Sequence, residues 1–112
     1  MNLPRRPRRM RQSPAIRALT QETWLRREDL IQPLFVFDAA SGQQEIESMP
    51  GIQRLGLEDL RRKTAVLHES GIQAVALFPC VEPSLKNAAG GEALNPDSLI
   101  ARAARALKES TP

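Results

Sequence analysis

Residues 74–87 read AVALFPCVEPSLKN, and this stretch decides the class of fold that the sequence encodes. The apolar run at 74–78 predicts a buried strand, and a proline, a cysteine and a lysine follow it. In α/β proteins, ligands bind at the carboxyl ends of strands. Cys80, the only cysteine, and Lys86, one of three lysines, are therefore the first candidates for residues that carry chemistry.

Strands and helices alternate around this stretch. The run LIQPLFVF at 30–37 predicts a first strand that is covered on both faces. Because Pro33 has no amide hydrogen, part of this strand is expected to be irregular or to lie at a sheet edge. Residues 38–54 are expected to form a loop, and residues 72–78 form the second strand. Strands that alternate with helices predict right-handed crossovers and a parallel sheet, so the fold class is α/β.

A helix is expected after each strand. The first spans 57–70, begins after Gly56 as N-cap and ends at Gly71. The second begins with Asn95 as N-cap and runs to about residue 108. The expected apolar faces are Leu57, Leu60, Thr64 and Leu67 in the first helix, and Leu99, Ile100, Ala103 and Leu107 in the second.

The basic character of the sequence belongs to an N-terminal arm. The chain has a net charge of +3, but residues 1–30 carry eight arginines and three acids, and the remainder is slightly acidic. The first dozen residues, MNLPRRPRRMRQ, have no apolar period and are expected to be extended or disordered. Ser13 and Pro14 predict the start of a short helix that reaches about Glu22.

Composition limits the class of protein. A chain of 112 residues suits one small domain, and no apolar run is long enough to cross a membrane. A single cysteine allows no internal disulfide and favours a reducing compartment, so we expect a cytoplasmic protein with no membrane partner. One cysteine and one histidine do not make a convincing metal site.

Two parallel strands cannot close a barrel or satisfy their edges, and the last helix has no following strand. We therefore expect the chain to be an incomplete domain. The expected division is an arm with a short helix at 1–28 and two βα units at 29–112.

Six short motifs of the chain together form a recognisable pattern. In order along the chain they are RPRRMR, DLIQPLFVF, SMPGIQRL, GIQAVALFP, LKNAAGGEALNPDSL and ARAARALKE. Together, in this order, they resemble the N-terminal third of the porphobilinogen synthase family, also called 5-aminolevulinate dehydratase. The chain departs from the usual family pattern at Asn87, Gly91 and Cys80.

The resemblance implies a TIM (β/α)8 barrel, of which this chain holds the first two βα units. Enzymes of the family condense two molecules of 5-aminolevulinate to porphobilinogen, a step of tetrapyrrole (heme) biosynthesis. Two lysines on later strands form Schiff bases with the substrates, and zinc or magnesium assists in many members. No residue of this chain matches a catalytic, cofactor-binding or metal-binding position, so the chain alone is expected to be inactive.

The arginines of the arm are assigned to a subunit interface. The guanidinium group binds carboxylates in a bidentate geometry that suits protein interfaces. The resemblance implies that the arm wraps a neighbouring barrel in a homo-octamer. A nucleic-acid partner is disfavoured because no aromatic residues are interleaved with the arginines. The interface residues are Arg5, Arg6, Arg8, Arg9 and Arg11.

The other polar residues are interpreted as scaffold. Cys80 is expected to be a partly buried strand-end residue, and Lys86 a loop residue in a setting too wet for Schiff-base chemistry. His68 lies on a helix flank, and the AAGG at 88–91 lacks the lysine of a phosphate loop. The acidic residues expected to be solvated and without a basic partner are Glu45, Glu47, Glu58 and Asp59.

Two other functions stay open. One is a non-catalytic interaction module that binds barrel subunits through the arginine-rich arm. The other is a small basic protein that binds nucleic acid through the phosphates.

Overall fold

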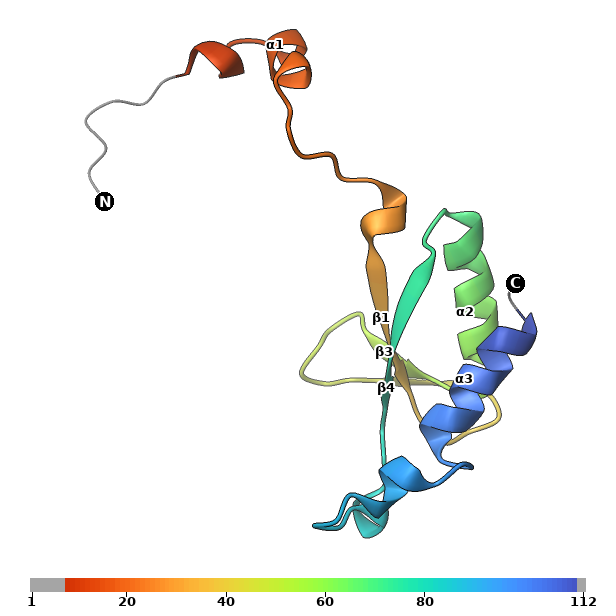
Figure 1. The fold of residues 1–112 in the computed structure, drawn as a ribbon. Helices are drawn as coiled ribbons and strands as arrows, with labels where there is room; N and C mark the ends of the chain where they lie inside the picture. Colours follow the sequence, from red (N-terminus) through yellow and green to blue (C-terminus); the bar gives the residue numbers. More distant parts are fainter. Residues whose placement is uncertain (1–7, 111–112) are drawn as a thin grey trace.

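The computed structural model describes residues 8–110, which form a slender arm and a compact α/β body (Figure 1). The arm holds a 3-10 turn at Arg9–Arg11, the short helix α1 at Pro14–Leu19 and a second 3-10 turn at Arg27–Asp29. Ser13 caps α1 as expected, because its hydroxyl accepts a 3.2 Å hydrogen bond from the amide of Ile16.

The arm differs from the sequence prediction in two details. Residues 9–11 are not extended, because the amide of Arg11 donates to the carbonyl of Arg8 at 2.9 Å and closes a turn. The helix α1 ends at Leu19 and not near Glu22, because the hydroxyl of Thr20 donates to the carbonyl of Ile16 at 2.8 Å and completes the last turn.

The body is built on a four-stranded sheet in the order β2-β3-β1-β4. Strand β1 spans Ile31–Val36 and strand β4 spans Ala74–Pro79. The two strands are parallel and in register from Ile31 opposite Ala74 to Val36 opposite Pro79. This pairing confirms the parallel arrangement that the alternation of strands and helices predicts.

Two short strands lie in the segment that was expected to be a loop. Strand β2 at Gln43–Glu45 is antiparallel to β3 at Gln53–Leu55, and β3 is parallel to the end of β1. All three residues of β2 are exposed, so this strand has no apolar alternation by which the sequence could reveal it. The prediction of a loop over 38–54 is wrong for this reason.

The first half of β1 has an open edge. Strand β3 pairs only with Phe35 and Val36, so the edge beside Ile31–Leu34 has no neighbour on that side among the described residues. Alternate residues of a strand direct their backbone groups to the same side. The amide of Phe37 donates to Leu55 of β3, so the backbone of Pro33 points to that side as well and lies on the open edge. Its carbonyl accepts a 3.1 Å hydrogen bond from the side chain of Gln32.

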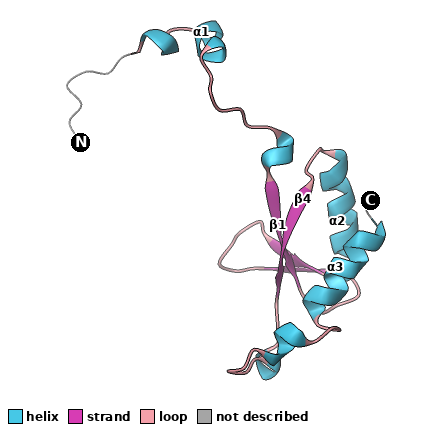
Figure 2. Cartoon of the chain, in the orientation of Figure 1, coloured by secondary structure: helices cyan, strands magenta, loops and turns pink. Residues whose placement is uncertain are grey.

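Both long helices cover the same face of the sheet (Figure 2). Helix α2 spans Leu57–Glu69 and helix α3 spans Leu99–Ser110. Leu60 and Val36 are completely buried between helix and sheet. The core confirms the predicted apolar faces except at Ile100, which is half-buried and lies outside the core. The buried members of the core are Leu34, Val36, Leu55, Leu60, Leu99, Ala103 and Leu107.

Glycines mark both ends of α2, as predicted. Gly56 is the N-cap, and a methyl group there would lie 2.7 Å from the backbone of Ser41. Gly71 follows the helix with a φ of +91°, a conformation that favours glycine. The close approach at Gly56 holds the loop after β1 against the start of α2.

Helix α3 begins later than predicted. Its first residue is Leu99, and the hydroxyl of Ser98 accepts from the amide of Ala101 at 3.4 Å. Asn95 is not the N-cap, because its side chain accepts a 2.9 Å hydrogen bond from the amide of Asp97 and forms a turn before the helix. Two 3-10 turns precede this point, at Pro83–Leu85 and Gly91–Leu94.

The other face of the sheet carries apolar side chains that the described residues leave open. Ile31 is 64% exposed and Phe78 is 50% exposed, and Pro33 is also exposed. Ile31 and Pro33 alternate along β1 with the buried Leu34 and Val36, and Phe78 lies on the neighbouring strand β4. Among residues 8–110, no helix is long and apolar enough to span a membrane.

Candidate functional site

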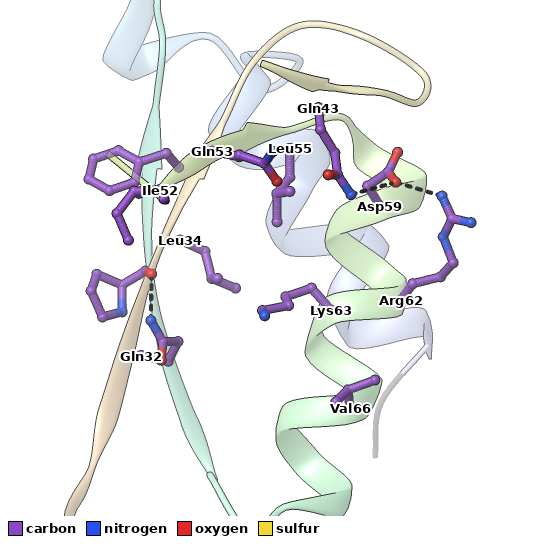
Figure 3. A pocket seen from close by; sticks show the side chains of 13 residues that line it. Gln32, Leu34, Gln43, Ile52, Gln53, Leu55, Asp59, Arg62, Lys63 and Val66 are labelled. Carbon is purple, nitrogen blue, oxygen red and sulfur yellow. Dashed lines mark hydrogen bonds and ion pairs between the residues drawn. The ribbon is translucent and has the colours of Figure 1, made fainter. Parts of the chain in front are cut away.

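A groove of about 430 Å³ lies between the open edge of β1, the hairpin of β2 and β3, and helix α2 (Figure 3). Strand β1 contributes Gln32 and Leu34, and β3 contributes Gln53 and Leu55. Lys63 extends from α2 across the groove toward β1. The groove therefore has an apolar floor and a rim of amide and ammonium groups.

Asp59 is the most constrained polar residue beside this groove. It is the third residue of α2, is largely buried, and accepts a 2.6 Å hydrogen bond from the backbone amide of Gly42. Arg62 donates to its carboxylate at 2.6 Å, and the side chain of Gln43 does so at 3.4 Å. This network ties the loop after β1 to the first turn of α2.

The environment of Asp59 sets its protonation. The amide of Gly42 lowers the pKa of Asp59 most, partial burial acts in the opposite direction, and the charge of Arg62 lowers it further. The pKa of Asp59 is therefore below its ordinary value. The prediction that Glu58 and Asp59 lack basic partners is wrong, since Arg62 binds Asp59 and Arg61 lies 3.5 Å from Glu58. Asp59 is also buried and not solvated, whereas Glu58 is exposed as predicted.

The chemistry available in the groove is that of binding. Its rim offers hydrogen bonds from the amides of Gln32, Gln43 and Gln53 and one positive charge from Lys63. Within residues 8–110, no three His, Cys, Asp or Glu side chains come together in a group that could hold a metal ion. The open backbone edge of β1 beside an apolar floor can receive another strand, except at Pro33, which has no amide hydrogen to donate.

The carboxyl ends of β1 and β4 meet at a smaller pocket of about 230 Å³. Asp38 follows β1, and its carboxylate forms a 2.7 Å ion pair with Arg102 of α3. This hydrogen bond raises the pKa of Arg102 above its ordinary value. Arg102 also donates to the carbonyl of Asp97 at 3.2 Å, so it joins the loop after β1 to the loop before α3.

Cys80 and Lys86 lie on the connection that leaves β4. Cys80 is exposed, so the prediction that it is partly buried is wrong. Cys80 directly follows β4, and its amide still donates to the carbonyl of Val36 at 2.7 Å, but no neighbouring element covers the residue. Lys86 is also exposed and follows the 3-10 turn at 83–85, as expected for a loop residue.

His68 and Cys80 are not brought together. His68 is exposed near the carboxyl end of α2, which adjoins the start of β4, whereas Cys80 follows the end of that strand. The two residues therefore lie beyond opposite ends of β4. They do not form a nucleophile and base pair.

The arm arginines fall partly outside the described residues. Arg5 and Arg6 lie in the part that the structure does not describe, and Arg8, Arg9 and Arg11 are exposed. The sequence analysis missed four residues that tie the loops to the helices, namely Asp59, Arg62, Asp38 and Arg102. The spacing of Asp59 and Arg62 on one helix is the signal that could have found the first pair.

Comparisons with known proteins agree on one family. The family model described as Delta-aminolevulinic acid dehydratase matches residues 4–112. The chain is 38% identical to Delta-aminolevulinic acid dehydratase of Bradyrhizobium diazoefficiens over 112 residues, which cover 100% of this chain and 32% of the relative. It is 35% identical to that of Escherichia coli, covering 99% of this chain and 34% of the relative.

A solved structure shows the same arrangement of strands and helices. The delta-aminolevulinic acid dehydratase (porphobilinogen synthase) of Toxoplasma gondii, in complex with the reaction product porphobilinogen, matches with a TM-score of 0.85 and 44% identity. The match covers 98% of this chain and 31% of that one. The chain thus spans about a third of the length of the relatives that it matches. It belongs to the delta-aminolevulinic acid dehydratase family.

Proposed function

We propose that this chain supplies the first two βα units of a porphobilinogen synthase. The complete enzyme condenses two molecules of 5-aminolevulinate to porphobilinogen with loss of water, in heme and tetrapyrrole biosynthesis. One observation carries the proposal: β1 and β4 pair in parallel with both helices on one face, and this arrangement aligns over 98% of the chain with a solved porphobilinogen synthase.

The proposed fold is a portion of a (β/α)8 barrel at 29–112, preceded by an arm at 1–28. Two open edges support it. Strand β4 is the last strand in the sheet order, and the first half of β1 faces the groove. Further strands that pair at these two edges would close a barrel, and the exposed face with Ile31 and Phe78 would then line its interior.

The groups that carry the chemistry are proposed to lie outside this chain. Schiff-base formation needs a lysine whose amine is desolvated, whereas Lys86 is exposed in a loop and Lys63 is exposed on α2. Among residues 8–110, no three His, Cys, Asp or Glu side chains come together in the way that a protein zinc site requires. What this chain contributes is the scaffold and the loops at the carboxyl ends of two strands.

The arm is proposed to pack on a second copy in a homo-oligomer, which the family resemblance makes an octamer. Its apolar side chains have no cover from the body, with Leu19 85%, Leu25 77% and Trp24 61% exposed. Residues 1–30 carry an excess of positive charge and the remainder an excess of negative charge, so arm and body attract each other. We place the protein in the cytoplasm, because an exposed free thiol such as Cys80 suits a reducing compartment.

A chimera tests the proposed function. Residues 1–112 replace the matching third of the Escherichia coli enzyme, which is 35% identical to this chain. We expect the chimera to form porphobilinogen from 5-aminolevulinate. A second chimera that lacks residues 1–28 is expected to keep its fold and lose its large oligomer.

The outcomes separate the proposal from its alternative. A folded chimera without activity contradicts the enzyme assignment. If that inactive chimera still joins wild-type subunits in mixed oligomers, the chain is instead a non-catalytic interaction module.

A further inference from the structure

Among residues 8–110, one side chain of the arm forms a hydrogen bond to the body. Within the described residues, the side-chain hydrogen bonds and ion pairs of residues 8–29 stay inside that segment, with the exception of Arg27. The guanidinium of Arg27 donates to the backbone carbonyl of Ser70 at 3.3 Å. The two residues are 43 positions apart, so this bond fixes the base of the arm to a distant element.

The acceptor is well suited to a cation. Ser70 is the C-cap of α2, where the last carbonyl groups of a helix lack partners within the helix and carry a partial negative charge. The hydroxyl of Ser70 donates to the carbonyl of Val66 at 2.7 Å, which orders this end of the helix. A guanidinium placed there gains both a hydrogen bond and a favourable interaction with the helix dipole.

The aliphatic part of Arg27 is held as well. A methyl group placed on Gly71 would lie 3.0 Å from Cδ of Arg27 and 3.6 Å from its Cβ, so the arginine stem crosses directly over this glycine. Gly71 has a φ of +91° and no side chain, and it therefore leaves the space that the stem occupies. The contact is thus polar at one end and packed along its length.

Arg27 itself sits in a defined turn. It opens the 3-10 turn 27–29, in which the carboxylate of Asp29 accepts a 2.9 Å hydrogen bond from the amide of Arg26. The amide of Leu30 donates to the carbonyl of Arg27 at 3.1 Å, immediately before β1 begins. The backbone on both sides of Arg27 is therefore fixed relative to the sheet.

We propose that Arg27 is a positioning residue that fixes the base of the arm on the end of α2 and so sets the direction in which the arm leaves the body. This direction keeps Trp24 and Leu25 uncovered by their own chain and presents them to a second copy. The proposal rests on the assembly role that we propose for the arm. It adds that the orientation of the arm is set within one chain, before any partner binds.

The chain offers its own pair of probes for a test. Trp24 is the only tryptophan and Cys80 the only cysteine, and Cys80 is exposed and open to labelling. Time-resolved energy transfer from Trp24 to a fluorophore on Cys80 measures the distribution of distances between the base of the arm and the body. Dilution into excess unlabelled Trp24→Phe chain restricts the signal to transfer within one chain.

We compare the parent with Arg27→Ala, Arg27→Lys and the control Arg26→Ala, which removes an equal charge one residue earlier. The parent and Arg26→Ala are expected to give one narrow distribution. Arg27→Ala is expected to lower the ratio of attached to detached arm about fivefold, the usual effect of one hydrogen bond, and to broaden the distribution. Arg27→Lys is expected to restore part of the attached population.

An equally narrow distribution in Arg27→Ala, or a broad one in the parent, overturns the proposal. Sedimentation of the same samples reports assembly separately. If the arm is attached as expected but no oligomer forms, the inference about Arg27 stands and the proposed interface is wrong.

Discussion

The rings of Phe35 and Phe78 lie 5.5 Å apart, centre to centre, on the sheet face away from both helices. They come from neighbouring parallel strands, at positions directly opposite each other. An aromatic pair in contact is an apolar surface of the kind that proteins bury. In this chain Phe78 is half exposed, so the pair lies on an apolar face of the sheet that the described residues leave open to solvent.

The first prediction is that the isolated chain associates through this face. Phe78→Ser should weaken self-association about tenfold or more, because burying a phenylalanine contributes about 1.5–3 kcal/mol. Sedimentation velocity over a concentration series measures the effect. Val66→Ser is the control, because Val66 is exposed to a similar degree but lies on α2, which covers the opposite face of the sheet.

A different result would show that the face is covered in a way the structure does not indicate. A chain that stays monomeric at high concentration and unfolds in one sharp transition above about 60 °C would be such a result. Circular dichroism during heating provides the measurement.

The second prediction concerns the centre of the core. Leu60 is completely buried among β1, β3 and α3, and Leu60→Ala should destabilise the fold by about 2–5 kcal/mol. This loss is comparable to the whole stability of a small domain, so we expect the variant to lose its cooperative unfolding transition. The matched control is Val66→Ala on the same helix, which should cost much less because Val66 is 57% exposed.

The third prediction is a pH dependence that arises from Asp59. Its pKa is lower in the folded chain than its ordinary value, so its ionised form stabilises the fold at neutral pH. This stabilisation is present above the ordinary pKa and is lost as the pH falls through the lower pKa of the folded state. The urea midpoint should therefore fall steadily below about pH 5, and less steeply in Asp59→Asn.

The amide resonance of Gly42 gives a local check, since this amide donates to Asp59. Its chemical shift should titrate with a midpoint below 3.8, the ordinary value for this carboxyl group. Glu58→Gln is the control, because Glu58 is exposed and should leave the Gly42 titration unchanged. A Gly42 midpoint above 3.8 would contradict the network around Asp59.

The fourth prediction is that the chain alone converts no 5-aminolevulinate. Borohydride reduction in the presence of this substrate should leave its three lysines, Lys63, Lys86 and Lys108, without an adduct. The physical reason is that all three lysines are exposed, whereas Schiff-base formation needs a lysine whose amine is desolvated. Mass spectrometry of tryptic peptides measures adducts, and a substrate adduct on Lys63 or Lys86 above background would locate chemistry within this chain.

The elements with strong apolar patterns could be predicted from the sequence. The strands at 30–37 and 72–78 and the helix that follows Gly56 lie within about two residues of their predicted bounds. Their signals are long and apolar, and glycines punctuate the ends of the helix. The parallel pairing of the two strands then follows from the helix between them.

Elements held by polar contacts could not be predicted in this way. Strand β2 consists of exposed Gln43, Gln44 and Glu45 and is defined only by its partner β3. Helix α3 begins at Leu99, later than predicted, because the side chain of Asn95 accepts from the amide of Asp97 and Ser98 accepts from the amide of Ala101. Asp59 looked like any acidic residue in a first helical turn, and only the folded loop shows that Gly42 comes back to meet it.

Pro33 has a consequence for how the open edge of β1 behaves before it is covered. An unpaired strand edge is a template for indiscriminate growth of sheets between molecules. At Pro33 the edge has no amide hydrogen to offer, and its carbonyl is already engaged by the side chain of Gln32. A strand from another chain could not form its usual hydrogen bonds at Pro33, so this residue disfavours aggregation through the open edge.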